Sequence, residues 1–370
     1  MIGQWIGHYS GSNNGLIIVN IDESDTNYQG IAYLHDGESY LPSSAAEFQT
    51  ADKNNVFEID SIVYPINSQN GAVGTWESLK GLFNPDLIFP KTARVSGKLE
   101  NNELSLSWTT DIGTYGSCKL KKSAVETPSE LPTKQMTWDA FKKHIITLER
   151  SKFIFRGQRK PWRLRTSFHR HSRTNLYKFL QEDIQVLHKH LSARTEHVFD
   201  LDKPNENGAF FNLVQHHGYP TPLLDWSHSP YVAAFFAYRG LTKEAVQKAP
   251  NDFVRIHVFN HLDWKRDFTQ EMNLLTSRLH FSVCEFLAIE NERMIPQQGI
   301  SSLTNVDDIE SYIQFQEHQQ SKSYLTAIDL PVAERQLVTE ELQYMGITAG
   351  SLFPGLDGSC EEIKQKLFRI

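Results

Sequence analysis

The sequence predicts two domains of different fold class, an all-β domain over residues 1–125 and an α+β domain over residues 137–370. A chain of 370 residues exceeds what one ordinary hydrophobic core supports. Its first third alternates apolar and polar residues, whereas the remainder mixes helical periodicity with short apolar runs and shows no strict βαβ order. A proline-bearing stretch, residues 126–136, lies between the two patterns and is expected to be a linker.

The all-β domain is predicted to be a small barrel or sandwich of short antiparallel strands. Turn residues separate its alternating segments, and Asn101 with Asn102 is expected to close a hairpin. No catalytic constellation is visible in this domain, so we expect a recognition or regulatory module. The expected strands are residues 15–22, 28–34, 56–59, 93–99, 104–108 and 116–120.

The α+β domain is predicted from helix caps and apolar runs. Thr137 is placed to cap a helix that carries Trp138 on its apolar face. Gly218 and the prolines after it are expected to stop another helix, and Ser229 with Pro230 is expected to start the next one. Further helices are expected over residues 175–191, 205–217 and 331–344, and strands over residues 153–155, 223–225, 253–259, 283–289 and 324–330.

The composition is typical of a soluble globular protein, and we expect a cytoplasmic one. No apolar run reaches membrane-spanning length, so no membrane partner is expected, and the first ten residues lack the basic and apolar regions of a secretory signal. Cys118, Cys284 and Cys360 are scattered and odd in number, which indicates reduced thiols rather than a disulfide framework or a zinc site.

Charge is distributed unevenly along the chain. The net charge is −7, yet residues 152–178 contain nine basic residues and no acidic one. Interleaved with Trp162 and Phe168, such a tract can hold the phosphates of a dinucleotide or a polynucleotide. The alternative is a solvated basic face that acids elsewhere in the chain balance. The basic residues are Lys152, Arg156, Arg159, Lys160, Arg163, Arg165, Arg170, Arg173 and Lys178.

Two stretches place polar side chains where buried elements are expected to end. Residues 153–158 read as a short strand that ends in Arg156, and Gly157 lets the backbone pass close to a neighbour or a ligand. In residues 215–236 two histidines precede an apolar strand that ends in Asp225. Structural needs alone do not normally place so many polar groups at such points, so both stretches are candidates for a functional site.

Four blocks of sequence resemble the FRG domain, and they occur in the order of that family. They are FRGQ at residues 155–158, QHHGYPTPLLDWS at 215–227, NERMIPQQG at 291–299 and GITAGSLFPGLDG at 346–358. The resemblance covers residues 137–370. It implies an ADP-ribosyltransferase-like fold, in which helices surround a split β-sheet with an NAD cleft. The implied reaction cleaves the nicotinamide–ribose bond of NAD and passes ADP-ribose to a nucleophile.

The resemblance also implies roles for individual residues. Asp225 would stabilise the ribosyl cation or activate the acceptor, His216 would orient NAD or act as a general base, and Gln297 would bind a ribose hydroxyl. The structural alternatives are an Arg156–Asp225 ion pair, a helix cap by Asp225, a helix-terminal role for His216 and a core position for Trp226. The residues expected to bind NAD are Arg156, Gly157, Gln158, Trp226 and Ser227.

One position departs from the FRG pattern, and another feature departs from that of many transferases. Gln297, Gln298 and Gly299 agree with the FRG pattern, but many transferases carry a glutamate there, on the third strand. Pro222 stands where the family usually has arginine, which removes one candidate partner for a phosphate or for Asp225. The acids near the third strand in sequence are Glu285, Glu290 and Glu292.

Together these features lead us to expect an NAD-dependent ADP-ribosyltransferase, a bacterial toxin or anti-phage defence effector that modifies RNA or DNA. A protein is the alternative acceptor, and an antitoxin or inhibitor protein is an expected partner. Two other function classes stay open. One is a metal-dependent nuclease or hydrolase that is indifferent to NAD, and the other is a non-enzymatic module that binds a ligand without turnover.

Overall fold

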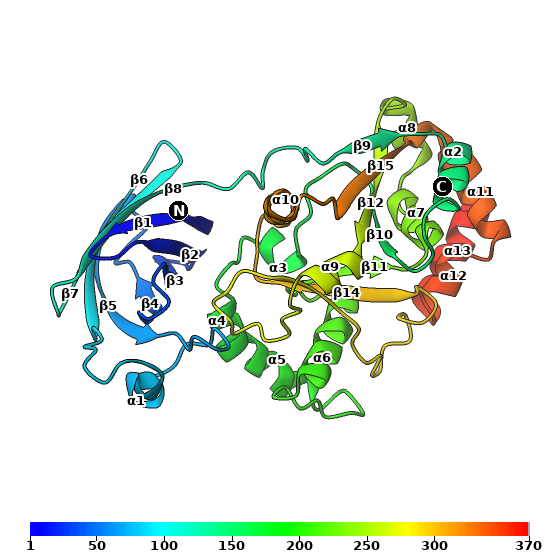
Figure 1. Cartoon of the computed structure of the whole chain (residues 1–370). Helices are drawn as coiled ribbons and strands as arrows, with labels where there is room; N and C mark the ends of the chain where they lie inside the picture. The colour runs from blue at the N-terminus through cyan, green and yellow to red at the C-terminus, as the bar shows by residue number, and fades with distance from the viewer. Residues whose placement is uncertain (369–370) are drawn as a thin grey trace.

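The computed structural model describes residues 1–368, which form a β-barrel beside a larger domain of helices and strands (Figure 1). The barrel lies at one end of an elongated molecule. Eight antiparallel strands build it, and pairing of β1 with β8 closes it. The strands are β1 (Gly3–Gly11), β2 (Gly15–Glu23), β3 (Tyr28–Asp36), β4 (Ser44–Gln49), β5 (Val56–Pro65), β6 (Thr92–Glu100), β7 (Glu103–Thr110) and β8 (Tyr115–Lys121), with a short helix α1 (Trp76–Leu79) between β5 and β6.

The barrel confirms the predicted all-β domain and excludes the sandwich. Its inward side chains form one core that includes Trp5, Ile17 and Leu104. Asn101 and Asn102 have φ values of 51° and 60°, which is the left-handed pair that a two-residue hairpin turn requires. Strands β1 and β4 were not expected, and in β4 the run of small and polar residues carries no clear alternation.

The second domain is built on one seven-stranded sheet of order β13-β14-β11-β10-β12-β15-β9. All neighbours are antiparallel except β15 and β9. Strands β10 and β11 share a single residue pair, Phe155 with Ser227, so the sheet nearly divides in two at this point. The strands are β9 (Thr133–Gln135), β10 (Phe153–Gln158), β11 (Leu223–Ser227), β12 (Phe253–Asn260), β13 (Phe281–Cys284), β14 (Gly299–Thr304) and β15 (Leu325–Pro331).

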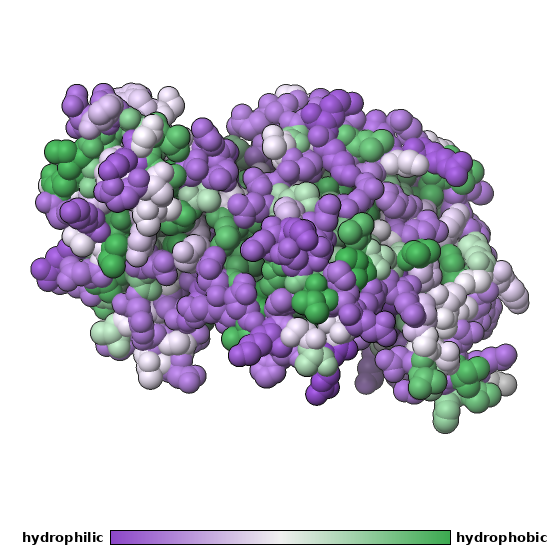
Figure 2. Space-filling view, turned by 90° about the horizontal axis from the view of Figure 1, so that it is seen from below, coloured by the Kyte–Doolittle hydropathy of each residue, from purple (hydrophilic) through white to green (hydrophobic). Residues whose placement is uncertain are grey.

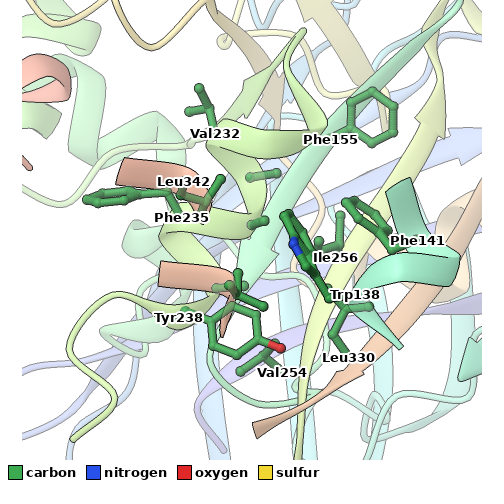
Figure 3. Packing of buried hydrophobic residues seen from close by; sticks show 14 of the residues in the cluster. Trp138, Phe141, Phe155, Val232, Phe235, Tyr238, Val254, Ile256, Leu330 and Leu342 are labelled. Atoms are coloured by element: carbon green, nitrogen blue, oxygen red, sulfur yellow. The ribbon is translucent and has the colours of Figure 1, made fainter. Parts of the chain in front are cut away.

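Helices cover both faces of this sheet. On one face, α2, α7 and α11 enclose a core that includes Trp138, Tyr238 and Ile256 (Figure 3). On the other face, α9 and α10 pack around Phe259 and Trp264. The helices are α2 (Trp138–Ile145), α3 (Ser167–Arg170), α4 (Leu176–Lys178), α5 (Ile184–Leu191), α6 (Pro204–His216), α7 (Pro230–Tyr238), α8 (Lys243–Lys248), α9 (His261–Asp267), α10 (Ile309–Gln320), α11 (Arg335–Tyr344), α12 (Ala349–Leu352) and α13 (Leu356–Phe368).

Three expected elements differ from those in the structure. The strand predicted over residues 283–289 is wrong beyond Cys284, where β13 ends and a loop begins. The loop makes side-chain contacts in place of strand pairing. In one of them Glu285 forms an ion pair with Lys265 at 3.0 Å. The helix expected over residues 175–191 is divided by a π-helical turn, Phe179–Asp183. Residues 133–135, within the expected linker, form the edge strand β9.

No helix in residues 1–368 has the length and apolar character needed to cross a membrane. The face of the molecule in Figure 2 is largely hydrophilic, and its apolar residues gather in small groups over the barrel and at the opposite end.

Candidate functional site

A cavity of about 310 Å³ lies where β10 and β11 separate. The ends of these two strands, the last turn of α6 and one side of α7 form its wall, and the loop before β14 completes it. Every residue that the sequence analysis placed in the site lines this cavity except Gln158. The lining residues are Phe155, Arg156, Gly157, Gln215, His216, Asp225, Trp226, Ser227, Ala233, Phe236, Arg293, Gln297 and Phe353.

Asp225 and Arg156 face each other across the separated strands. The guanidinium of Arg156 donates to the backbone carbonyl of Asp225 at 2.6 Å, whereas the Asp225 carboxylate accepts from the Gln215 side chain at 2.5 Å. Their side chains make no ion pair in the described part of the chain, and Ser229 rather than Asp225 caps α7. One carboxylate oxygen of Asp225 is left for a ligand, because only Oδ1 is hydrogen-bonded within residues 1–368.

Arg156 is a partly buried cation without a full set of partners. Its Nε is buried and has no hydrogen-bond partner among the described residues. The pKa of its guanidinium is lowered to about 10, mainly by burial and to a smaller extent by nearby Arg170, while Asp225 opposes the shift. The side chain therefore stays charged at neutral pH, and a bound anion would relieve the cost of its desolvation.

Gly157 is required by packing. A Cβ atom at this position would lie 1.9 Å from the carbonyl oxygen of Ala233 and 2.7 Å from the backbone nitrogen of Ala237. The glycine thus lets α7 lie directly against β10, which brings Phe236 of α7 to the cavity. Of the two uses that the sequence left open for Gly157, close approach to a neighbouring segment is the one present here.

His216 ends α6 with one ring nitrogen engaged. Nδ1 lies 2.7 Å from the side-chain oxygen of Asn291, which favours the tautomer with its proton on Nδ1. Nε2, which has no hydrogen-bond partner in the part of the chain that the structure describes, is then an acceptor. Arg293, another residue of the cavity, donates to the backbone carbonyl of His216 at 2.8 Å. His216 is therefore oriented by the loop before β14 and keeps a nitrogen available as a base.

Gln297 and Ser227 join that loop to the strand. Ser227 donates its hydroxyl proton to the carbonyl of Gln297 at 2.7 Å, and the Gln297 amide donates to the carbonyl of Leu352 at 2.9 Å. The ring of Trp226 lies in the core, where its indole N–H donates to Ser302 at 2.9 Å. These contacts give Ser227 and Trp226 structural roles at the edge of the cavity.

Six residues of the cavity were missed by the sequence analysis. The rings of Phe236 and Phe353 lie edge to face at 5.9 Å and supply the aromatic surface that Trp226 does not. Arg293 adds a cation on the loop side. Four of the missed residues fall inside the motif blocks, so the blocks could have indicated them, whereas Ala233 and Phe236 lie beyond the second block on α7. The four are Phe155, Gln215, Arg293 and Phe353.

No acid takes the place of the third-strand glutamate. Glu285 pairs with Lys265, Glu290 accepts from the backbone N–H of His197 at 2.5 Å, and neither of them nor Glu292 lines the cavity. The residue of β14 opposite Asp225 is Ser301, which donates to Asn212 at 2.8 Å. Asp225 is thus the one carboxylate among the described residues that line the cavity.

A second cavity of about 810 Å³, which we call the basic cleft, adjoins the first and shares Arg156, Gly157 and Phe236 with it. Gln158 lies here and donates to the backbone of Trp162 at 2.9 Å. Among the described residues that line the basic cleft, Glu126 is the single carboxylate. The basic residues of its lining are Arg156, Arg159, Lys160, Arg163, Arg165 and Arg170.

The cations of the basic cleft fall into two sets. Arg163 pairs with Asp308 at 3.2 Å and Arg165 pairs with Asp307 at 2.7 Å, so both hold the cleft against the start of α10. The other four make no ion pair in residues 1–368. Within the same range no group of three or more His, Cys, Asp or Glu side chains is arranged to hold a metal ion. The unpaired cations are Arg156, Arg159, Lys160 and Arg170.

Comparison with known proteins gives one match. No curated protein and no solved structure matches this chain. The family model of the FRG domain matches residues 151–245, a segment that contains β10, β11, α7 and the two unpaired groups Arg156 and Asp225 of the cavity. The predicted resemblance to the FRG domain is thereby confirmed over residues 151–245, which contain the first two of the four blocks, whereas the blocks at residues 291–299 and 346–358 lie outside the match.

Proposed function

We propose that the cavity at the division of the sheet binds NAD and that the protein is an ADP-ribosyltransferase with an ADP-ribosyltransferase-like fold. One observation carries the proposal: the carboxylate of Asp225 and the partly buried guanidinium of Arg156 line the same cavity, and Arg156 also lines the adjoining cleft, which holds four unpaired cations. The smaller cavity suits the nicotinamide and its ribose, and the basic cleft suits the pyrophosphate.

Residues that line the cavity and the basic cleft supply the groups that the proposed reaction needs. Nicotinamide leaves with the electron pair of the C–N bond, and the carboxylate of Asp225 stabilises the positive charge that develops on the ribose. The acceptor nucleophile then forms the new bond at the same carbon, and its proton passes to Nε2 of His216. Arg156 and Arg170 hold the phosphates, and Phe236 with Phe353 offers the ring surface for nicotinamide.

A nucleic acid is the proposed acceptor. Arg159 and Lys160 are exposed at the mouth of the basic cleft, and the indole of Trp162 beside them is 55% exposed. An exposed aromatic ring among unpaired cations is the combination that binds single strands, since the cations attract phosphates and the ring stacks on a base. In this proposal the protein is a toxin or defence effector, and an inhibitor protein would cover the cleft.

The test uses NAD labelled at its adenylate phosphate, incubated with the full chain and separately with RNA, single-stranded DNA and bacterial protein extract. We expect label on a nucleic acid and stoichiometric release of nicotinamide. Asp225→Asn should lower the rate by about 10²- to 10³-fold. Asp202→Asn, which changes an exposed carboxylate outside both cavities, should leave it unchanged. Intact folded protein that neither releases nicotinamide nor transfers label would contradict the proposal.

A binding module is the second candidate, because the β14 position opposite Asp225 is a serine and no second carboxylate lines the cavity within residues 1–368. Calorimetric titration separates the two. Saturable NAD binding without nicotinamide release would favour the module. Growth arrest of bacteria that express the wild type, but not Asp225→Asn, would favour the toxin.

A further inference from the structure

A third cavity, of about 670 Å³, lies between the barrel and the second domain, and we call it the seam cavity. Figure 1 shows α10 beside the barrel at this place. Its wall from the barrel includes Ile6 and Leu16, and its wall from the second domain includes Leu279, Tyr312 and Phe315. The apolar residues come from both domains, so only the docked arrangement of the two creates the cavity.

Direct hydrogen bonds fix the two sides of the seam cavity. Gln4 donates to the carbonyl of Asn305 at 2.8 Å and accepts from the backbone N–H of Asp307 at 3.0 Å. A ring nitrogen of His35 lies 3.1 Å from the carbonyl of Ser277. Gln4 and His35 both line the cavity, so its shape is set by the interface itself and does not depend on a ligand.

A deeply buried carboxylate secures the same interface. Asp22, which is 1% exposed, accepts from the guanidinium of Arg173 and from the backbone N–H of Thr174, both at 2.6 Å. These bonds join β2 of the barrel to residues 173 and 174 of the second domain, so the interface that forms the seam cavity is hydrogen-bonded at a second place besides Gln4 and His35.

The charges around the seam cavity select the ligand. Two cations line it, Lys121 and Arg278, and neither pairs with a carboxylate among the described residues. Arg278 donates instead to the backbone carbonyls of Ser68 and Gln69. The one acid in the lining, Asp308, is engaged by Arg163. We propose that the seam cavity binds a small apolar anion, an aromatic carboxylate or sulfonate, with its ring between the two domains and its charge on Lys121 and Arg278.

The seam cavity is connected to the basic cleft through the start of α10. Asp308 lines the seam cavity and pairs with Arg163, a residue of the cleft. Glu310, fully buried on the same helix, accepts from the backbone N–H of Leu164 at 2.9 Å. A ligand that displaces α10 therefore also displaces residues 163–165, which are bonded to the start of that helix. We infer that the ligand regulates access of anions to the basic cleft. This inference does not require the transferase proposal.

The test uses two fluorescent probes of similar shape with the full chain: anilinonaphthalene sulfonate, which is anionic, and N-phenylnaphthylamine, which is neutral. We expect one saturable sulfonate site per chain and at least tenfold weaker binding of the neutral probe. Phe315→Ser should weaken binding of both probes at least tenfold, because Phe315 forms part of the apolar wall of the seam cavity. The side chain is 59% exposed, so its replacement spares the core. The double variant Lys121→Gln with Arg278→Gln should weaken the sulfonate alone.

Two controls make the outcome decisive. Tyr344→Ser removes a ring that is 90% exposed and lies outside the seam cavity, so it should change neither affinity. Hydrogen–deuterium exchange with and without the sulfonate should show added protection in residues 163–165. Sulfonate binding that survives both Phe315→Ser and the double variant overturns the site. Unchanged exchange in residues 163–165 with the probe bound overturns the connection to the cleft.

Discussion

Replacing Gly157 by alanine tests whether the close contact between β10 and α7 requires a residue without a side chain. The new Cβ would lie 1.9 Å from Ala233 O and 2.9 Å from Ala233 C, and both are backbone atoms that cannot turn away. An ordinary contact needs about 3.5 Å, so α7 must move away by more than about 1 Å. Ala233 and Ala237 are 1% and 0% exposed, so this shift opens a packed core.

The expected cost follows from that geometry. Overpacking of a core costs about 1–3 kcal/mol, and a clash with the backbone of a helix belongs at the upper end of that range. A loss of about 3 kcal/mol corresponds to a Tm lower by about 6–12 °C for a domain of this size. We expect the same variant to weaken NAD binding, since α7 carries Phe236 into the cavity.

Urea unfolding followed by circular dichroism measures the change in the free energy of unfolding. Gly81→Ala is the matched control, because a Cβ at Gly81 meets nothing within 4 Å and its φ is not positive. We expect that control to change stability by less than about 0.5 kcal/mol. A Gly157→Ala protein as stable as the control would refute the argument that this glycine is required by packing.

Three further predictions concern the interface, acid stability and the cleft. Asp22→Ala should cost about 3–5 kcal/mol, since it removes one of the two ion pairs of Arg173 and leaves the buried backbone N–H groups of Thr174 and Asn175 without an acceptor, and calorimetry should then show the barrel and the second domain unfolding separately. Burial lowers the pKa of His169 to about 3, so the unfolded chain binds the extra proton below pH 6.5 and stability falls as pH drops from 6.5 towards 3. His169→Gln should lower the slope of the free energy of unfolding against pH by about 1.4 kcal/mol per pH unit, measured by urea unfolding at pH 6 and pH 4. Trp162→Ala should weaken binding of a dT12 strand by about tenfold in fluorescence anisotropy, while Ile146→Ala, at a distant exposed site, should not.

The parts of the fold that could be read from the sequence are those with local signals. Helix caps at Thr137 and Ser229 and the stop at Gly218, whose φ is +88°, lie where the residue types predict them. Strand β13 was placed too long, because an apolar run such as residues 283–289 does not reveal where its partner strand ends. That information lies in contacts between segments far apart in the chain.

The same limit applies to the site. Asp225 and Arg156 directly follow short apolar runs, so the sequence could single them out, but their place in one cavity depends on strands that share the single pair Phe155 with Ser227. Phe236 could not be chosen in advance, because α7 is apolar on nearly every side and its pattern does not show which side faces a cavity. The site residues themselves stay predictions until activity is measured.

The basic tract over residues 152–178 could be found from composition, but its function could not, because ion pairs divide it. Five of its nine cations are paired with acids: Lys152, Arg163, Arg165, Arg173 and Lys178. The other four, which have no ion pair within residues 1–368, all line the basic cleft. A paired cation gives up its partner to reach a phosphate, so only the unpaired four should release counterions from a bound strand.

This division predicts the salt dependence of binding. For a single strand each phosphate neutralised contributes a slope of about −0.7 in log K against log salt, so four contacts give about −2.8 and nine would give about −6.3. Anisotropy titrations of labelled dT12 between 50 and about 300 mM salt measure this slope. The double variant Arg159→Gln with Lys160→Gln should bring it near −1.4, because two of the four contacts are lost. Lys189→Gln, which changes an exposed cation on α5, should leave it at the wild-type value. A wild-type slope near −6 would mean that the ion pairs to α10 and the barrel open on binding, and that the two sets of cations act as one.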